Sequence, residues 1–135
     1  METRDRIIDL ARTQNGKRPV GPDCDDLFGR FGMDGDDARE VVDAYVAEFD
    51  VRMDGFLWYF NHLGEPPIYR RILPVDLAGR PLPMIPVSVT DLVRIAEGRV
   101  WDIDYPTLTI RNRHRLWLWM TLGAFALGGV ALLVS

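Results

Sequence analysis

Carboxylate side chains crowd the segment from residue 23 to residue 54. It holds eleven acids and three arginines, a net charge of −8 in a chain whose formal net charge is −4. Clustered carboxylates can bind divalent cations, transfer protons or present a negative surface to a basic partner. An EF-hand loop needs glycine at its sixth position, where a loop from Asp34 has Arg39 and a loop from Asp23 has Phe28. We therefore favour a negative docking surface, with looser ion binding as an alternative.

Cys24 and His62 are the other residues with catalytic potential. A thiolate beside a histidine could act as a nucleophile, although nothing around either residue in the sequence supports such a pair. One cysteine cannot form an internal disulfide or a cysteine-rich zinc site. Trp58, Tyr59 and Phe60 could form an exposed patch, but core packing is the commoner role in a small domain. We therefore expect no catalytic residue, no metal site and no cofactor.

The last twenty residues, 116–135, carry no charged side chain. A helix of about twenty apolar residues is about 30 Å long, which matches the hydrocarbon core of a bilayer. The sequence therefore predicts one C-terminal transmembrane helix. Arg111, Arg113 and Arg115 precede this run, and positive residues stay on the cytoplasmic side. We expect a single-pass protein of a bacterial inner membrane, with its N-terminal domain in the cytoplasm.

Two pairs of residues in this tail suit contacts with lipid and with a second helix. Trp117 and Trp119 lie next to the arginines, where indole rings favour the headgroup region. Ala124 and Gly128 have the spacing that lets two membrane helices approach closely. The lipid bilayer is thus the expected partner of residues 116–135, and the tail allows homo-oligomers.

The acidic residues need a helix to position them. Apolar residues recur there at spacings of three and one, which is a one-sided helical stripe starting near residue 36. The stripe comprises Ala38, Val41, Val42, Tyr45, Val46 and Phe49. Asp34 or Asp36 is a suitable N-cap, and Asp37 favours the positive end of the helix dipole. Such a helix presents Glu40, Asp43 and Glu48 to solvent.

The segments around this helix differ in pattern. Residues 3–14 have an apolar face and predict a short helix, and the following segment 17–26 is rich in turn residues. Aromatic residues 54–63 predict a short helix or turn. Six prolines between residues 64 and 86 exclude long helices, leaving short extended pieces at 69–73 and 85–89.

A last helix is expected before the basic segment. Thr90 is its predicted N-cap, Gly98 ends it, and residues 99–110 form a linker or an extended piece. The inward-facing residues would be Leu92, Val93 and Ala96.

The start of the acidic helix resembles the centre of an acyl carrier protein. In that family a hydrophobic-x-x-Leu-Gly-x-Asp-Ser loop leads into an acidic recognition helix. The matching residues here are Phe31, Gly32, Asp34, Asp37, Glu40 and Val41, and residues 48–51 are similar to the end of that helix. The chain is also similar to short bacterial acyl-carrier-like proteins that define a domain of unknown function. Those similarities lie at Tyr59-Phe60 and at Asp91-Leu92-Val93 with Gly98 and Trp101.

The chain departs from acyl carrier proteins at Gly35. The resemblance implies a serine there, because the phosphopantetheine arm is attached through that hydroxyl. Glycine offers no atom to modify, and the chain has only two serines, Ser88 and Ser135. The resemblance thus implies the fold and an acidic docking surface without the carrier chemistry.

These observations predict a mainly α protein with three parts. Residues 1–100 would form a small acyl-carrier-like helical bundle with a Pro-rich insertion, 101–115 a basic juxtamembrane linker, and 116–135 the membrane helix. We expect a non-enzymatic interaction module that binds a basic protein surface through Asp36, Asp37, Glu40, Asp43 and Glu48. The acidic balance excludes general nucleic-acid binding. An acyl carrier with an unconventional attachment site and an ion-binding regulatory domain are the alternatives.

Overall fold

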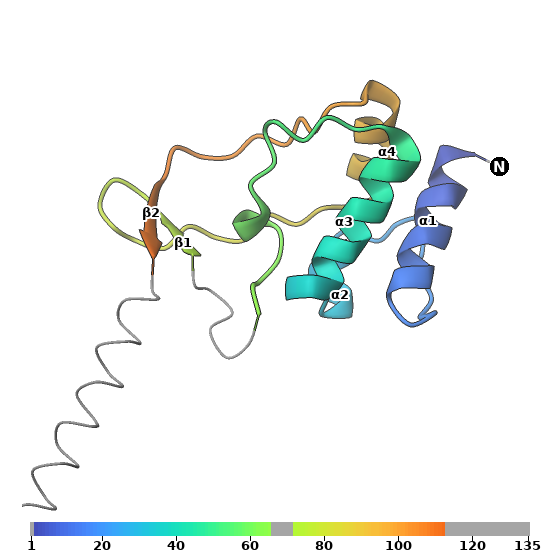
Figure 1. The fold of residues 1–135 in the computed structure, drawn as a ribbon. Coiled ribbons are helices and arrows are strands. Elements are labelled where there is room, and N and C mark those ends of the chain that lie inside the picture. Colours follow the sequence, from blue (N-terminus) through green and yellow to red (C-terminus); the bar gives the residue numbers. More distant parts are fainter. Residues whose placement is uncertain (1, 66–71, 113–135) are drawn as a thin grey trace, which may run out of the picture.

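The computed structural model describes residues 2–65 and 72–112, and within them the fold is mainly α (Figure 1). In chain order the elements are α1 (Thr3–Gln14), α2 (Leu27–Phe31), α3 (Gly35–Phe49), the 3-10 helix η1 (Trp58–Phe60), β1 (Ile72–Val75), α4 (Val89–Gly98) and β2 (Thr109–Asn112). The predicted helices at 3–14, near 36–49 and before Gly98 are confirmed. The five-residue helix α2 was not predicted.

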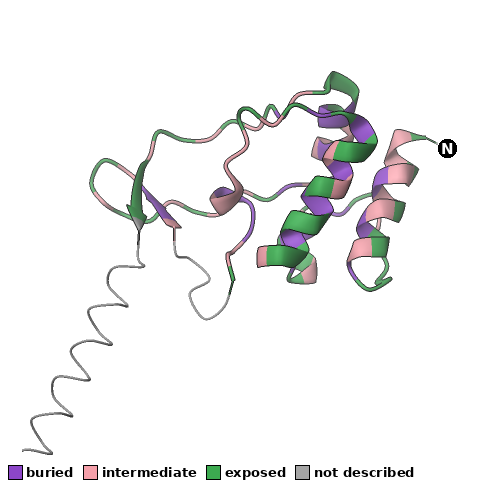
Figure 2. Cartoon of the chain, in the orientation of Figure 1, coloured by how far each residue is buried: buried purple, intermediate pink, exposed green. Residues whose placement is uncertain are grey.

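The core lies where α1, α3 and α4 meet (Figure 2). Ile7 and Ala11 of α1 and Ile95 of α4 are almost completely buried. The apolar stripe of α3 is confirmed, since all its members are buried except Val46, which is half-buried. The hydroxyl of Tyr45 donates a hydrogen bond to the Leu92 carbonyl at 2.6 Å, which joins α3 to α4 inside this core.

The predicted N-cap of α4 was wrong by two residues. Ser88 caps the helix, and its hydroxyl accepts a hydrogen bond from the Asp91 N–H at 2.9 Å. The Asp91 carboxylate accepts the Ser88 N–H in return, completing a capping box. Thr90 lies inside the first turn instead. On the inward face Leu92 and Ala96 are buried while Val93 is half-buried.

A two-stranded sheet and an isolated bridge connect the segments outside the helices. β1 and β2 form an antiparallel two-stranded sheet in which Leu73 pairs with Arg111. β1 overlaps the extended piece expected at 69–73, whereas residues 85–89 form no strand and lead into α4 instead. A parallel bridge between Arg52 and Val100 joins the segment that follows α3 to the segment that follows α4.

The expected membrane helix falls outside the described residues. Among residues 2–65 and 72–112, no helix is long and apolar enough to cross a membrane. Residues 113–135 contain Arg113, Arg115, Trp117 and Trp119, and lie outside the described part. Arg111 is described, is exposed on β2, and donates a hydrogen bond to the Gly79 carbonyl at 3.0 Å.

Candidate functional site

The five acidic residues expected to dock a partner are all exposed on α3. Two of them already have cationic neighbours. Asp36 lies 3.0 Å from the Arg39 guanidinium, and Glu48 lies 2.5 Å from that of Arg6 on α1. Within the described part of the chain, the other three form neither an ion pair nor a side-chain hydrogen bond. The three unpaired carboxylates belong to Asp37, Glu40 and Asp43. Glu48 therefore joins two helices, while the middle of α3 presents unneutralised charge.

An open groove runs beside α3, between this helix and the segment 53–65. Its cavity volume is about 480 Å³, within the range of roughly 300–1,000 Å³ that is typical of ligand sites. We call it the α3 groove. Its apolar wall consists of Val42, Val46, Met53, Phe56 and Trp58, and its polar lining of Asp36, Arg39, Asp43, His62 and Glu65. Asp43 thus belongs both to the predicted docking residues and to the groove.

The first residue of α3 has a backbone conformation that a serine would adopt only with strain. Gly35 has φ +52°, a left-handed value that costs a residue with a Cβ atom about 1–2 kcal/mol. A Cβ atom there would also collide with the Glu65 carboxylate, which would have to move aside. That carboxylate accepts a hydrogen bond from the Asp36 N–H at 2.5 Å. The start of α3 therefore already holds an anion from its own chain.

Two further hydrogen bonds connect the segment 61–65 to the start of α3. Asp34 occupies the predicted N-cap position, but its carboxylate makes no cap hydrogen bond to the helix. It accepts the Leu63 N–H at 3.0 Å, while the Leu63 carbonyl accepts the Gly35 N–H at 2.9 Å. The expected cap thus holds the wall of the α3 groove in position.

His62 is 7% exposed and is one of the residues that line the α3 groove. Its ring stacks on Trp58 at 5.3 Å and tilts against Phe28 at 5.5 Å. Nδ1 lies 2.8 Å from the Leu63 carbonyl, which can only accept, so Nδ1 carries the proton and Nε2 keeps a lone pair. Burial lowers the pKa of His62, although the Leu63 contact and the Asp34 charge oppose this shift. The ring is therefore neutral at pH 7.

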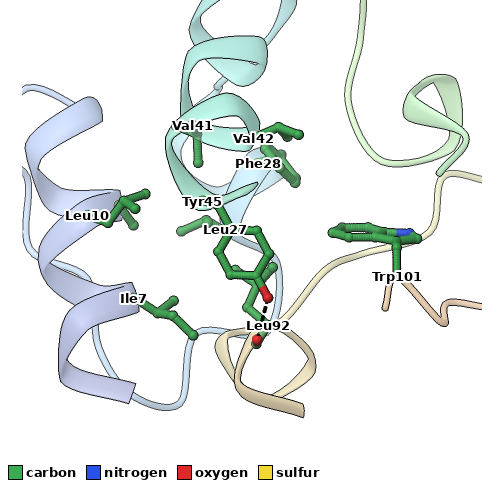
Figure 3. A pocket seen from close by; sticks show the side chains of 10 residues that line it. Ile7, Leu10, Leu27, Phe28, Val41, Val42, Tyr45, Leu92 and Trp101 are labelled. Carbon is green, nitrogen blue, oxygen red and sulfur yellow. Dashed lines mark hydrogen bonds between the residues drawn. The ribbon is translucent and has the colours of Figure 1, made fainter. Parts of the chain in front are cut away.

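Two further cavities lie among the described residues. A hollow of about 370 Å³, which His62 also lines, lies beside α2 and residues 84–86. The core also encloses a void of about 10 Å³ between Ile7, Tyr45, Leu92 and Trp101 (Figure 3). That void is as small as one water molecule, and the Tyr45 hydroxyl beside it is already bonded to Leu92. It is a packing defect of the core.

The structure separates the remaining candidate residues. Cys24 is buried, and burial raises the pKa of its thiol, which disfavours the reactive thiolate. No hydrogen bond joins Cys24 to His62 among the described residues. Phe60 is fully buried, as expected of a core residue, whereas Trp58 and Tyr59 are half-buried. No group of three or more His, Cys, Asp or Glu residues in the described ranges could hold a metal ion.

Sequence reasoning did not predict the groove, although it singled out His62 and Trp58 for other roles. Met53 and Glu65 were missed, because they reach the groove from the segment that follows α3 and no periodic pattern marks them. A comparison of the chain with protein families, curated proteins and solved structures finds no match.

Proposed function

We propose that this protein is a membrane-anchored, non-enzymatic interaction module whose helix α3 binds a basic surface of a partner protein. The observation that carries the proposal is the row of three carboxylates at Asp37, Glu40 and Asp43. They are exposed and lack a cation neighbour within the described residues. Solvated charges of one sign on a single face raise the rate of encounter with an oppositely charged surface and select against acidic partners.

The membrane anchor in this proposal is the uncharged run of residues 116–135, preceded by Arg111, Arg113 and Arg115. Confinement to a membrane surface raises the effective concentration of the module for partners on that membrane. A moderate affinity at α3 is then sufficient for a specific contact. In this proposal the module lies on the cytoplasmic side of a bacterial inner membrane, because positive residues beside a membrane span favour that side.

The acyl-carrier-like arrangement of helices is also part of the proposal, without the carrier reaction. Gly35 supplies no hydroxyl, and its positive φ together with the Glu65 carboxylate disfavours a serine at that position. Incubation of the intact protein with a phosphopantetheinyl transferase is expected to leave its mass unchanged. A gain equal to the phosphopantetheine arm would support the carrier alternative.

Charge reversal tests the docking surface. The double variant Glu40→Lys/Asp43→Lys is expected to weaken recovery of crosslinked partners from bacterial membranes at least tenfold, because two attractive charges become repulsive. Glu97→Lys, an exposed site on α4, is the control for added charge and should retain partner recovery. Equal recovery with the double variant and the control would contradict this function.

Truncation tests the anchor separately. A chain ending at residue 115 is expected to leave the membrane fraction, while the full chain requires detergent for extraction. Extraction of the full chain by buffer alone would contradict the anchor and would leave the α3 surface to be judged by the charge variants.

A further inference from the structure

The α3 groove combines an apolar wall with an excess of hydrogen-bond acceptors. Asp36, Asp43 and Glu65 contribute three carboxylates, while Arg39 is the single cation among the lining residues that the structure describes. The Arg39 charge is already matched by Asp36 at 3.0 Å. Asp43 therefore borders the apolar wall with its charge unneutralised by any described residue.

His62 is a further lining residue of the groove. The side chain is more than nine-tenths buried, and its Nδ1 proton is used by the Leu63 carbonyl. Nε2 has no hydrogen-bond partner among the described residues, and the one cation that lines the groove with His62, Arg39, is already paired with Asp36. An anionic ligand would meet three carboxylates and a ring without positive charge. The groove chemistry is thus complementary to a cation that donates hydrogen bonds.

The apolar wall indicates that the ligand also carries an apolar group next to its cation. Val46, Met53, Phe56 and Trp58 are all half-buried, so each leaves part of its apolar surface in the groove. Covering that surface stabilises a complex in proportion to the area removed from water. An aromatic wall also favours a guanidinium or ammonium group stacked upon it. A large apolar side chain next to a basic one meets both requirements.

The surrounding charge favours a peptide over a compact molecule. Asp37 and Glu40 continue the acidic surface of α3 beyond the residues that line the groove. A ligand that fills the groove alone leaves these carboxylates unmatched, whereas an extended basic segment reaches them.

We propose that the α3 groove binds a peptide segment of the partner protein in which a large apolar side chain is flanked by arginine or lysine. The apolar side chain packs against Val46 and Met53, and a neighbouring cation pairs with Asp43. This inference rests on the proposed function and specifies its partner, because the exposed carboxylates alone require only a basic surface.

The methionines allow a direct test on the full chain in phosphatidylcholine nanodiscs. With methyl-labelled methionine, the Met53 signal reports on the groove, Met84 on the second hollow, and buried Met33 on the core. Three amidated pentapeptides serve as probes: two arginines flanking a leucine, two arginines flanking a glycine, and two glutamates flanking a leucine. The first is expected to shift Met53 in a saturable manner while Met33 and Met84 stay in place.

The other probes separate the two requirements. The glycine peptide should bind at least fivefold more weakly because it lacks the apolar side chain, and the glutamate peptide should not shift Met53. A glutamate peptide that binds as well as the arginine peptide would overturn the inference, as would a shift of Met84 without Met53. A Met53 signal that changes with protein concentration or lipid before peptide is added assigns the groove to a second copy or to lipid, and also overturns it.

Matched variants on α3 locate the contact. Asp43→Asn is expected to weaken the leucine peptide about fivefold, as for an exposed ion pair, and Asp37→Asn only about twofold, because Asp43 lines the groove whereas Asp37 lies beyond it and attracts the peptide at longer range. Val46→Phe should fill the groove and abolish the Met53 shift, whereas Ala47→Phe, at the exposed neighbouring position, should preserve it. Equal effects within either pair would overturn the groove assignment. If Glu40→Lys/Asp43→Lys still weakened partner recovery, the docking surface would stand without the groove.

Discussion

The two sides of α3 differ in how completely they are covered. The side facing α1 and α4 is closely packed, and the void described there has a volume of about 10 Å³. The side facing residues 53–65 leaves a groove of about 480 Å³ and carries Asp43 at its rim. The first side is apolar and buried because that burial supplies the stability of the domain. The second side leaves part of its apolar surface exposed to solvent. Exposed apolar surface next to an unpaired charge is typical of a binding site.

The largest expected effect comes from truncating one apolar side chain on each side of α3 and comparing the loss in the free energy of unfolding. Ile95→Ala, in the packed core, is expected to lower the free energy of unfolding by about 3 kcal/mol, since the surrounding residues cannot collapse into the cavity. Val46→Ala, on the groove side, should cost about 1 kcal/mol or less because its side chain is half-buried. Urea unfolding in detergent, followed by circular dichroism, measures both. Equal losses would break the distinction between the two sides.

The buried hydrogen bond on the core side gives the next effect. Tyr45→Phe removes the donor to the Leu92 carbonyl and keeps the ring, so about 1 kcal/mol of stability should be lost. Burial and the nearby Asp102 charge also raise the pKa of Tyr45, which favours the protonated hydroxyl that makes this bond. The same unfolding assay applies. An unchanged midpoint would mean that this bond does not hold α4 against α3.

The groove side is expected to respond to pH through His62. Burial lowers its pKa in the folded state, so the unfolded chain takes up the proton first as pH falls below 6.5. Stability is then fully present above pH 6.5 and decreases below it, by less than about 1 kcal/mol at pH 6. Unfolding curves between pH 7.5 and 5.5 measure the slope, which His62→Gln should flatten. A slope that the variant retains would assign the titration to another group.

The smallest effect is expected at the ion pair that joins α1 to α3, at the exposed edge of the core side. Glu48 and Arg6 have side chains that are 44% and 41% exposed, so solvent screens their attraction. Glu48→Gln should cost less than about 0.5 kcal/mol at low salt and nothing measurable at 1 M salt. A larger loss that persists in salt would show that Arg6 packing over Phe49, at 4.8 Å, depends on the carboxylate.

The core side of α3 could be predicted from the sequence because its apolar residues recur at helical spacing. The spacing of Ala38, Val41 and Tyr45 alone determines which face is buried. The sequence also contains the signal for the cap of α4, since Ser88 is followed three residues later by the acidic Asp91, whereas Thr90 is followed at that spacing by Val93. α2 has only five residues, which is too short for a helical period to be visible.

The groove side could be predicted only in part. Asp43 was expected on the solvent face, whereas the opposite wall depends on contacts between residues far apart in the chain. Asp34 and Leu63 are 29 residues apart, as are Asp36 and Glu65, and no local pattern connects them. The sequence therefore indicated an acidic surface without showing that an apolar hollow borders it.

The Glu65 carboxylate at the start of α3 affects how dissolved anions can bind to this helix. The backbone N–H groups of a first helical turn ordinarily attract dissolved anions, but here the Asp36 N–H is already bonded to Glu65. Phosphate and sulfate would have to displace a tethered competitor of the same charge. Buffers rich in these salts should consequently leave this end of the helix untouched, even where they alter the domain by other means.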